Sequence, residues 1–196
     1  MGDSSPVCGP RSTIRSGGRG RAMRIREMTR RDVPAVRRIV RAGYEFLADE
    51  EGFSARQRRR LLEERCSAEW IGEHFMRCHS FVAISGDGIV GVVAVDGAEI
   101  AELFVAAPLR RRGIGARLFR KAEQVIADNG RPSLEVSTTG HAVRFYEAMG
   151  ARVICNDLVI DGPLVGWRCT CLSKDLPKEL GATPGKRRAI SDHQHA

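Results

Sequence analysis

A short run rich in arginine and glycine carries the strongest chemical signal in this sequence. It reads Arg110-Arg111-Arg112-Gly113-Ile114-Gly115-Ala116, between a strand-like stretch at 99–105 and a helix-like stretch at 113–129. The first turn of a helix exposes unpaired N–H groups and a partial positive charge. Glycines at 113 and 115 let a phosphate approach those N–H groups, and the arginines add attraction. The run therefore predicts a pyrophosphate-binding loop.

Two better-known phosphate loops do not fit this spacing. A Walker A loop needs a lysine after its second glycine, and this loop contains no lysine. A dinucleotide fingerprint needs a third glycine where Leu118 stands. An ordinary strand-to-helix turn with basic surface residues would explain the two glycines alone. The whole run, with the strand before it, favours phosphate binding.

Hydrophobic periodicity and turn residues predict the elements that position this loop. Thr29 and Asp32 have the spacing of a capping box, with Pro34 in the first turn of the helix that follows. A hairpin is expected at Gly86-Asp87-Gly88 and a tight turn at Asp96-Gly97. We expect a strand at 24–28, a helix from 33, a helical region at 54–78 broken near Ser67 or Gly72, strands at 81–84, 89–95 and 99–105, a helix at 113–129, a strand at 134–137, a helix at 142–149, and strands at 153–160 and 167–172.

Composition indicates one globular domain with two tails. The chain has 196 residues, of which 42% are hydrophobic and 29% charged. Residues 1–22 and 177–196 lack hydrophobic periodicity, so we expect disordered tails around a domain at 23–176. Much of the net charge of +8 lies in the tails and the arginine loop. That distribution favours a small polyanionic ligand over nucleic acid.

Other classes of protein and site find little support. No apolar stretch approaches the ~20 residues that span a bilayer, and no signal peptide is recognisable, so we expect a cytoplasmic protein without membrane contact. The six cysteines lack metal-ligand spacing, so no metal is expected. Arginine far outnumbers lysine, which is typical of a GC-rich bacterial genome.

Two segments and the order of elements resemble the GNAT N-acetyltransferase superfamily over residues 23–176. Leu103-Phe104-Val105 and the arginine loop match the R/Q-x-x-G-x-G/A pattern. Ala142-x-x-Phe145-Tyr146-Glu147-x-x-Gly150 matches A-x-x-F-Y-E-x-x-G. The resemblance implies an α/β (α+β) fold with a mixed, mostly antiparallel sheet of about seven strands and about four helices. In that fold a splayed parallel strand pair, here 99–105 and 134–137, holds acyl-CoA.

The resemblance also implies how acetyl-CoA, as co-substrate, would be bound. The backbone of Leu103, Phe104 and Val105 would hold the pantetheine arm, with the Val105 N–H directed at the thioester oxygen. The implied cofactor-binding residues also include Arg110, Arg111, Arg112, Gly113, Ile114, Gly115 and Ala116. Thr139 stands where the family often has asparagine, which puts the amide contact at that position in doubt.

The implied catalytic residues are Tyr146 and Glu99. Tyr146 would donate a proton to the departing thiolate. Glu99 lies where family members with a catalytic glutamate on this strand carry it, and it is preferred over Glu102 as the base that deprotonates the amine. Because strand residues alternate, 99 and 102 are expected to point to opposite faces. A water relay or the absence of an enzymatic base stays open.

The acceptor is not specified by the sequence. The resemblance implies that residues 44–75 and 158–167 recognise it. An amine on a small molecule, a protein N-terminus and a lysine all stay open as acceptors. A homodimer is compatible with the resemblance. Two competing functions stay open: an acyl-CoA-binding module without turnover, and a nucleic-acid-binding protein that uses the arginine-rich region 56–65 and the two tails.

Overall fold

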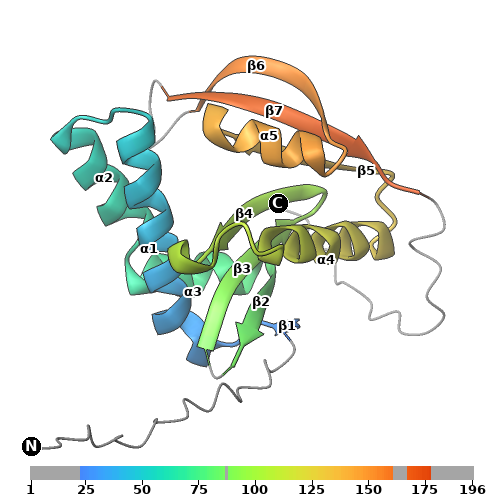
Figure 1. Cartoon of the computed structure of the whole chain (residues 1–196), viewed down its shortest axis with the longest axis horizontal. Coiled ribbons are helices and arrows are strands. Elements are labelled where there is room, and N and C mark those ends of the chain that lie inside the picture. Colours follow the sequence, from blue (N-terminus) through green and yellow to red (C-terminus); the bar gives the residue numbers. More distant parts are fainter. Residues whose placement is uncertain (1–22, 87, 161–166, 178–196) are drawn as a thin grey trace, which may run out of the picture.

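A computed structural model describes residues 23–86, 88–160 and 167–177. Seven strands form one sheet in the order β1-β2-β3-β4-β5-β7-β6 (Figure 1). The strands are β1 (Arg24–Glu27), β2 (His79–Ser85), β3 (Gly88–Asp96), β4 (Glu99–Val105), β5 (Ser133–Thr138), β6 (Arg152–Ile160) and β7 (Trp167–Asp175). The helices are α1 (Val33–Glu50), α2 (Ala55–Arg65), α3 (Ala68–Arg77), α4 (Ile114–Asp128) and α5 (Gly140–Ala148), with short 3-10 turns at Arg30–Asp32 and Ala107–Leu109.

The sheet is antiparallel except at its centre. β4 and β5 run parallel, and their only register pair joins Glu99 to Glu135. Beyond that pair β4 continues along β3, and β5 continues along β7. The two strands therefore diverge, and they leave a gap toward the end of β4 that leads into the arginine loop.

Side-chain hydroxyls and carboxylates set the helix starts. Asp32 accepts a hydrogen bond from the Thr29 N–H at 2.8 Å and an ion pair from Arg26 at 2.6 Å, which fixes the entry into α1. The hydroxyl of Ser54 caps α2, and that of Ser67 accepts from the Trp70 N–H at 2.9 Å to cap α3. The predicted break near Ser67 is thus confirmed, and the described part of the chain contains five α-helices, where about four were expected.

Two apolar cores lie on opposite faces of the sheet. One joins the sheet to α4 and α5, with Leu118, Phe119 and Leu134 fully buried. The other joins β2, β3 and β4 to α1, α2 and α3, with Leu61 and Phe75 fully buried. Figure 1 shows α1, α2 and α3 grouped together and separate from α4 and α5. The chain therefore forms three layers, with β4 between the two cores.

The predicted fold class and order of elements are confirmed. β2 and β3 pair antiparallel as expected of a hairpin, although Asp87 at its turn lies outside the described residues. The predicted tails at 1–22 and 177–196 also lie outside the described residues, apart from Pro177. No helix in the described part of the chain combines the length and apolarity that crossing a membrane requires.

Gly43 in α1 provides a test of how closely this helix packs on β4. A Cβ at Gly43 would lie 2.2 Å from Cδ1 of the Phe104 ring, whereas at Gly72 in α3 the nearest atom is 4.0 Å away. We expect Gly43→Ala to destabilise the fold by about 1–3 kcal/mol through overpacking. Gly72→Ala should instead be neutral or stabilising by up to about 1 kcal/mol, as alanine favours a helix. Urea unfolding of both variants measures this; equal effects would contradict the packing.

Candidate functional site

The loop between β4 and α4 has the backbone of an anion-binding turn. Gly113 precedes α4 with a φ of +77°, and a Cβ placed on it would meet no atom within 4 Å. Arg111 also adopts a positive φ, of 63°, a conformation that costs a non-glycine residue on the order of 1–2 kcal/mol. Residues that hold such strained conformations concentrate at binding sites. The space above Gly113 is open and suits an approaching phosphate.

The first turn of α4 has N–H groups to offer. The first hydrogen bond within the helix runs from Arg117 N–H to the Gly113 carbonyl at 3.1 Å. The N–H groups before it, at Ile114, Gly115 and Ala116, precede any intrahelical acceptor. No side chain caps this terminus, and its first turn contains no acidic residue. The helix start is therefore an unneutralised positive end, which favours an anion.

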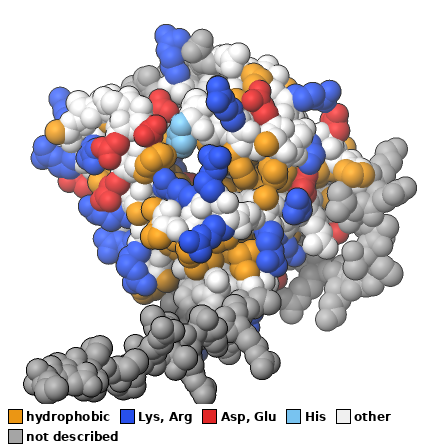
Figure 2. Space-filling view, viewed as in Figure 1, with side chains coloured by type: hydrophobic (Ala, Val, Ile, Leu, Met, Phe, Trp, Pro, Cys, Tyr) orange, Lys and Arg blue, Asp and Glu red, His pale blue; other side chains and the backbone are white. Residues whose placement is uncertain are grey.

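Side chains from α1 and α5 form a rim beside this loop. The Arg110 guanidinium carbon lies 4.2 Å from the centre of the Phe46 ring, and the His141 ring meets the same phenylalanine edge-on at 5.6 Å. His141 Nδ1 lies 2.8 Å from the Thr139 hydroxyl. Arg110 is thus held by stacking, and Thr139 binds its own helix neighbour. Figure 2 shows basic side chains gathered over the face on which α4 begins.

The packing of α5 behind the loop explains why position 115 has no side chain. A Cβ at Gly115 would contact the Phe145 ring at 3.4 Å and Val105 at 3.7 Å. The absence of a side chain there lets α4 and α5 approach each other beside the end of β4. Phe145 is also 5.0 Å from the Tyr146 ring, measured between ring centres.

The gap between β4 and β5 presents backbone groups of β4. The Ala106 N–H donates to the Val90 carbonyl on β3 at 2.9 Å. Because backbone groups alternate sides along a strand, the N–H groups of Val105 and Leu103 point away from β3 and into the gap. Phe104 instead bonds toward β3, and its ring lies 5.1 Å from Tyr44 on α1. The gap can therefore accept an extended arm as an added strand.

A bulge in β4 corrects the expectation that Glu99 and Glu102 point to opposite faces. Ala94 pairs with Glu102, but the next residue, Val95, pairs with Ile100, so Ala101 is an extra residue. Ile100 packs in the core with α4, whereas Glu102 faces α1. Since Glu99 alternates with Ile100, Glu99 and Glu102 share one face. The expectation was wrong because strand alternation fails at a bulge.

Glu102 lies buried at the contact between β4, α1 and α3. Only 8% of Glu102 is exposed, and the Tyr44 hydroxyl donates to its carboxylate at 2.9 Å. Burial raises the pKa of Glu102 to about 7, against the opposing effects of the Tyr44 hydrogen bond and Arg65. His74 Nε2 lies 3.8 Å from this carboxylate and has no hydrogen-bond partner among the described residues. Burial lowers the pKa of His74 to about 4, so His74 is neutral at neutral pH.

Glu99 has a different environment at the start of β4. The residue is exposed, yet nearby protein removes enough water to raise the pKa of its carboxyl group, and Asp96 and Glu135 raise it further by repulsion. Glu135 is its direct partner across the parallel pair. Glu99 is thus an accessible carboxylate with increased basicity.

Tyr146 on α5 is a buried phenol, with 6% of the residue exposed. Its ring packs against Phe119 and Phe145, and within the described residues its hydroxyl finds no hydrogen-bond partner. Burial raises the pKa of Tyr146, and the Glu102 charge raises it further. The phenol therefore stays protonated at neutral pH and is free to donate its proton.

Sequence reasoning missed Tyr44, His74 and Glu135 as members of this region. Tyr44 follows Val36 and Val40 at helical spacing, so the pattern indicated a buried residue but not its polar contact. His74 and Glu135 join Glu102 and Glu99 only through strand and helix packing. Among the described residues no group of three His, Cys, Asp or Glu side chains is placed to hold a metal ion.

The family is decided by a match to the "Acetyltransferase (GNAT) domain", which covers residues 48–163, more than half of the chain. The chain belongs to the GNAT acetyltransferase family. This match includes β4, the arginine loop, α4, β5 and α5. A comparison with curated proteins finds no significant match.

Solved GNAT structures have the same fold. A GCN5-related N-acetyltransferase from Rhodopseudomonas palustris is 19% identical, with a TM-score of 0.70 over 80% of this chain and 98% of that chain. The PaiA N-acetyltransferase from Thermoplasma acidophilum, solved with coenzyme A, is 15% identical, with a TM-score of 0.64 over 79% and 99%. An aminoglycoside 6'-N-acetyltransferase complexed with coenzyme A is 18% identical, with a TM-score of 0.56 over 77% and 96%. At these identities the likeness shows the fold.

The buried Glu102 of this GNAT domain should make its stability depend on pH. Because its pKa rises from 4.5 to about 7 on folding, the folded state favours the protonated acid, and stability falls as pH rises through that window. We expect Glu102→Gln, which keeps an acceptor for Tyr44, to remove a loss of about 3 kcal/mol between pH 4.5 and 8. Urea unfolding at both pH values measures it, with the exposed Glu73→Gln as control. Parallel pH curves for wild type and Glu102→Gln would contradict the burial of this charge.

Proposed function

We propose that this protein transfers an acetyl group from acetyl-CoA to an amine by direct attack of the amine on the thioester. The observation that carries the proposal is the uncapped start of α4 at Gly113, continuous with the gap between β4 and β5. The start of α4 offers N–H groups to a pyrophosphate, and the gap offers the backbone of β4 to an extended arm. Acetyl-CoA contains both parts in that order.

The residues near the loop suit the diphosphate of coenzyme A. The N–H groups at Ile114, Gly115 and Ala116 have no acceptor within α4, and a phosphate would fill the open space above Gly113. Arg110, Arg111 and Arg112 supply positive charge around it, with Arg110 held over Phe46. Anions bind helix starts of this kind because dipole and hydrogen bonds act together.

The backbone of β4 would position the thioester. The Leu103 and Val105 N–H groups face the gap, so the thioester oxygen can accept a hydrogen bond there. Negative charge develops on that oxygen in the tetrahedral intermediate, and a fixed donor stabilises it by about 2.7–4 kcal/mol where measured. When the intermediate collapses, the C–S bond breaks and the departing thiolate takes the proton of Tyr146.

Glu99 is the proposed base. An alkylammonium has a pKa of about 10.4 and must lose a proton before it attacks. Glu99 is exposed on the face shared with Glu102, and its pKa is raised, so it can take this proton directly or through water. Glu102 is buried and already accepts from Tyr44, which leaves it less accessible to an acceptor. The acceptor itself is an amine of a small molecule or of a protein.

Gly113 and Gly130 form a matched pair for testing the coenzyme site. They flank α4 with φ values of +77° and +74°, and a Cβ on either meets no atom within 4 Å, so alanine costs each the same backbone strain. We expect Gly113→Ala to weaken CoA binding at least about tenfold, or 1.4 kcal/mol, because the methyl group occupies the phosphate's space. Calorimetric titration with CoA measures it.

Gly130→Ala, at the far end of α4, should bind CoA as wild type does. Equal losses in the two variants would mean that strain, and not phosphate contact, weakens binding. The absence of CoA uptake by the folded wild type would remove the proposed function itself.

The pH dependence of turnover distinguishes the proposed role of Tyr146 from that of Glu99. We expect Tyr146→Phe to reduce kcat about 100-fold or more at every pH between 6 and 9, with CoA affinity unchanged, because the raised pKa keeps the phenol protonated throughout. Glu99→Gln should instead remove the fall in kcat/KM on the acidic side. CoA release followed with a thiol reagent across a panel of amines measures both.

Glu102→Gln is the control for the base. If Glu99 is the base, Glu102→Gln should keep the fall in kcat/KM at acidic pH. If Glu102 is the base, Glu102→Gln should remove that fall. Unchanged turnover in Tyr146→Phe would assign that residue to the core alone.

A further inference from the structure

A groove between α1 and α2 lies outside the coenzyme site. Its volume is about 730 Å³, and it is lined by Arg37 and Arg41 from α1 and by Arg58 and Arg59 from α2. Glu63 is the one acidic residue of the lining, and Leu62 contributes an apolar surface. None of the lining residues belongs to the arginine loop at 110–116. The groove thus gathers four guanidinium groups against a single carboxylate.

Partners within the protein neutralise only part of this charge. Arg41 pairs with Glu45 at 2.9 Å, and Arg58 pairs with Asp49. The Nε of Arg37 donates to the Cys66 carbonyl at 2.6 Å, which fixes the guanidinium group but leaves its charge unpaired. In the described chain neither Arg37 nor Arg59 has a carboxylate partner. These two cations therefore face the groove with hydrogen-bond donors to spare.

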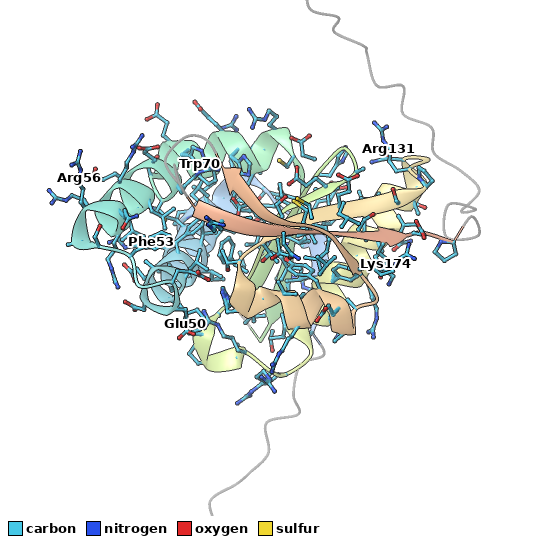
Figure 3. The ribbon with its side chains drawn as sticks, turned by 90° about the horizontal axis from the view of Figure 1, so that it is seen from above. Glu50, Phe53, Arg56, Trp70, Arg131 and Lys174 are labelled. Atoms are coloured by element: carbon cyan, nitrogen blue, oxygen red, sulfur yellow. The ribbon has the colours of Figure 1, made fainter. Side chains whose placement is uncertain are left out.

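The remaining arginines of α2 do not line the groove. Arg60 pairs with Glu64 at 2.7 Å, and Arg65 lies over the Trp70 ring at 5.1 Å. Arg56 points away from the body of the molecule at the outer end of α2, as Figure 3 shows. The helix therefore lacks the single basic face that would lie along a nucleic acid. Only the groove brings its arginines together with those of α1.

We propose that the groove between α1 and α2 binds an organic phosphate carrying at least two phosphate charges, as a second anion site of this protein. The guanidinium group is planar and always charged, and its paired N–H donors match phosphate oxygens. A volume of about 730 Å³ lies within the range of small-molecule sites, roughly 300–1,000 Å³. Leu62 and Ala55 offer contact to the organic part of such a ligand.

Inorganic pyrophosphate is the first probe, and the protein is saturated with CoA beforehand so that the loop at 110–116 is filled. Calorimetric titration should then reveal one further site. We expect Arg59→Gln to weaken pyrophosphate binding at least about tenfold, because Arg59 has no structural partner to lose. Arg56→Gln, one turn away on the same helix, should change it less than about twofold. Adenosine triphosphate as a second probe should bind more tightly than pyrophosphate and show the same two responses.

Three results would overturn the proposal: no pyrophosphate uptake by the CoA-saturated protein, equal losses in Arg56→Gln and Arg59→Gln, and loss of the second site in Gly113→Ala but not in Arg59→Gln. Equal losses in Arg56→Gln and Arg59→Gln would mean that the positive charge of α2 as a whole attracts the anion, and not the groove. Anion binding in the groove can be tested independently of CoA binding. If the protein takes up no CoA, the titration is run on Gly113→Ala, and the comparison of Arg59 with Arg56 decides in the same way.

Discussion

The structure depends on an interruption of hydrogen bonding at the centre of its sheet. β4 and β5 share one register pair, Glu99 with Glu135, and then separate. Backbone groups that lose a partner inside a protein cost free energy unless water or a ligand satisfies them. The N–H groups of Leu103 and Val105 face that gap, and the same strand continues into the loop that starts α4. The gap and the helix start therefore form one continuous surface because they are consecutive in the chain.

The bulge at Ala101 places two carboxylates on the face beside this gap. It turns Glu99 toward the side of Glu102. Burial is the main cause of the raised pKa of both carboxyl groups. The charge of Glu99 raises the pKa of Glu102 further, whereas Asp96 and Glu135 do so for Glu99. The Tyr44 hydrogen bond offsets part of the cost of burying Glu102. The charge of Glu102 also raises the pKa of Tyr146 on α5. The charge of Glu102 therefore acts on the phenol of Tyr146 from the central strand.

Local spacing predicted the parts of this site that a short stretch of chain determines. The glycine-containing loop before α4 and the short helix that carries Tyr146 follow from glycine placement and periodicity near those residues. The left-handed conformation of Gly113, one residue before α4 begins, appears only in the structure. The bulge escaped prediction because it is defined by the register against β3, which the spacing of 99 and 102 does not contain. For the same reason Glu135 and His74 were not associated with the site. Contacts made across strands and helices need the tertiary structure.

Helix α1 connects the two proposed anion sites through different faces. Gly43 and Tyr44 pack on β4, where Tyr44 holds Glu102, and Phe46 supports Arg110 of the coenzyme loop. Arg37 and Arg41, on the preceding turns, line the groove with α2. A ligand that spans α1 and α2 would therefore contact the helix that positions both the buried carboxylate and the stacked arginine. Side chains in a close-packed interior transmit displacement to their neighbours. A ligand in the groove that displaces α1 would therefore also shift the residues of α1 that contact the proposed coenzyme site.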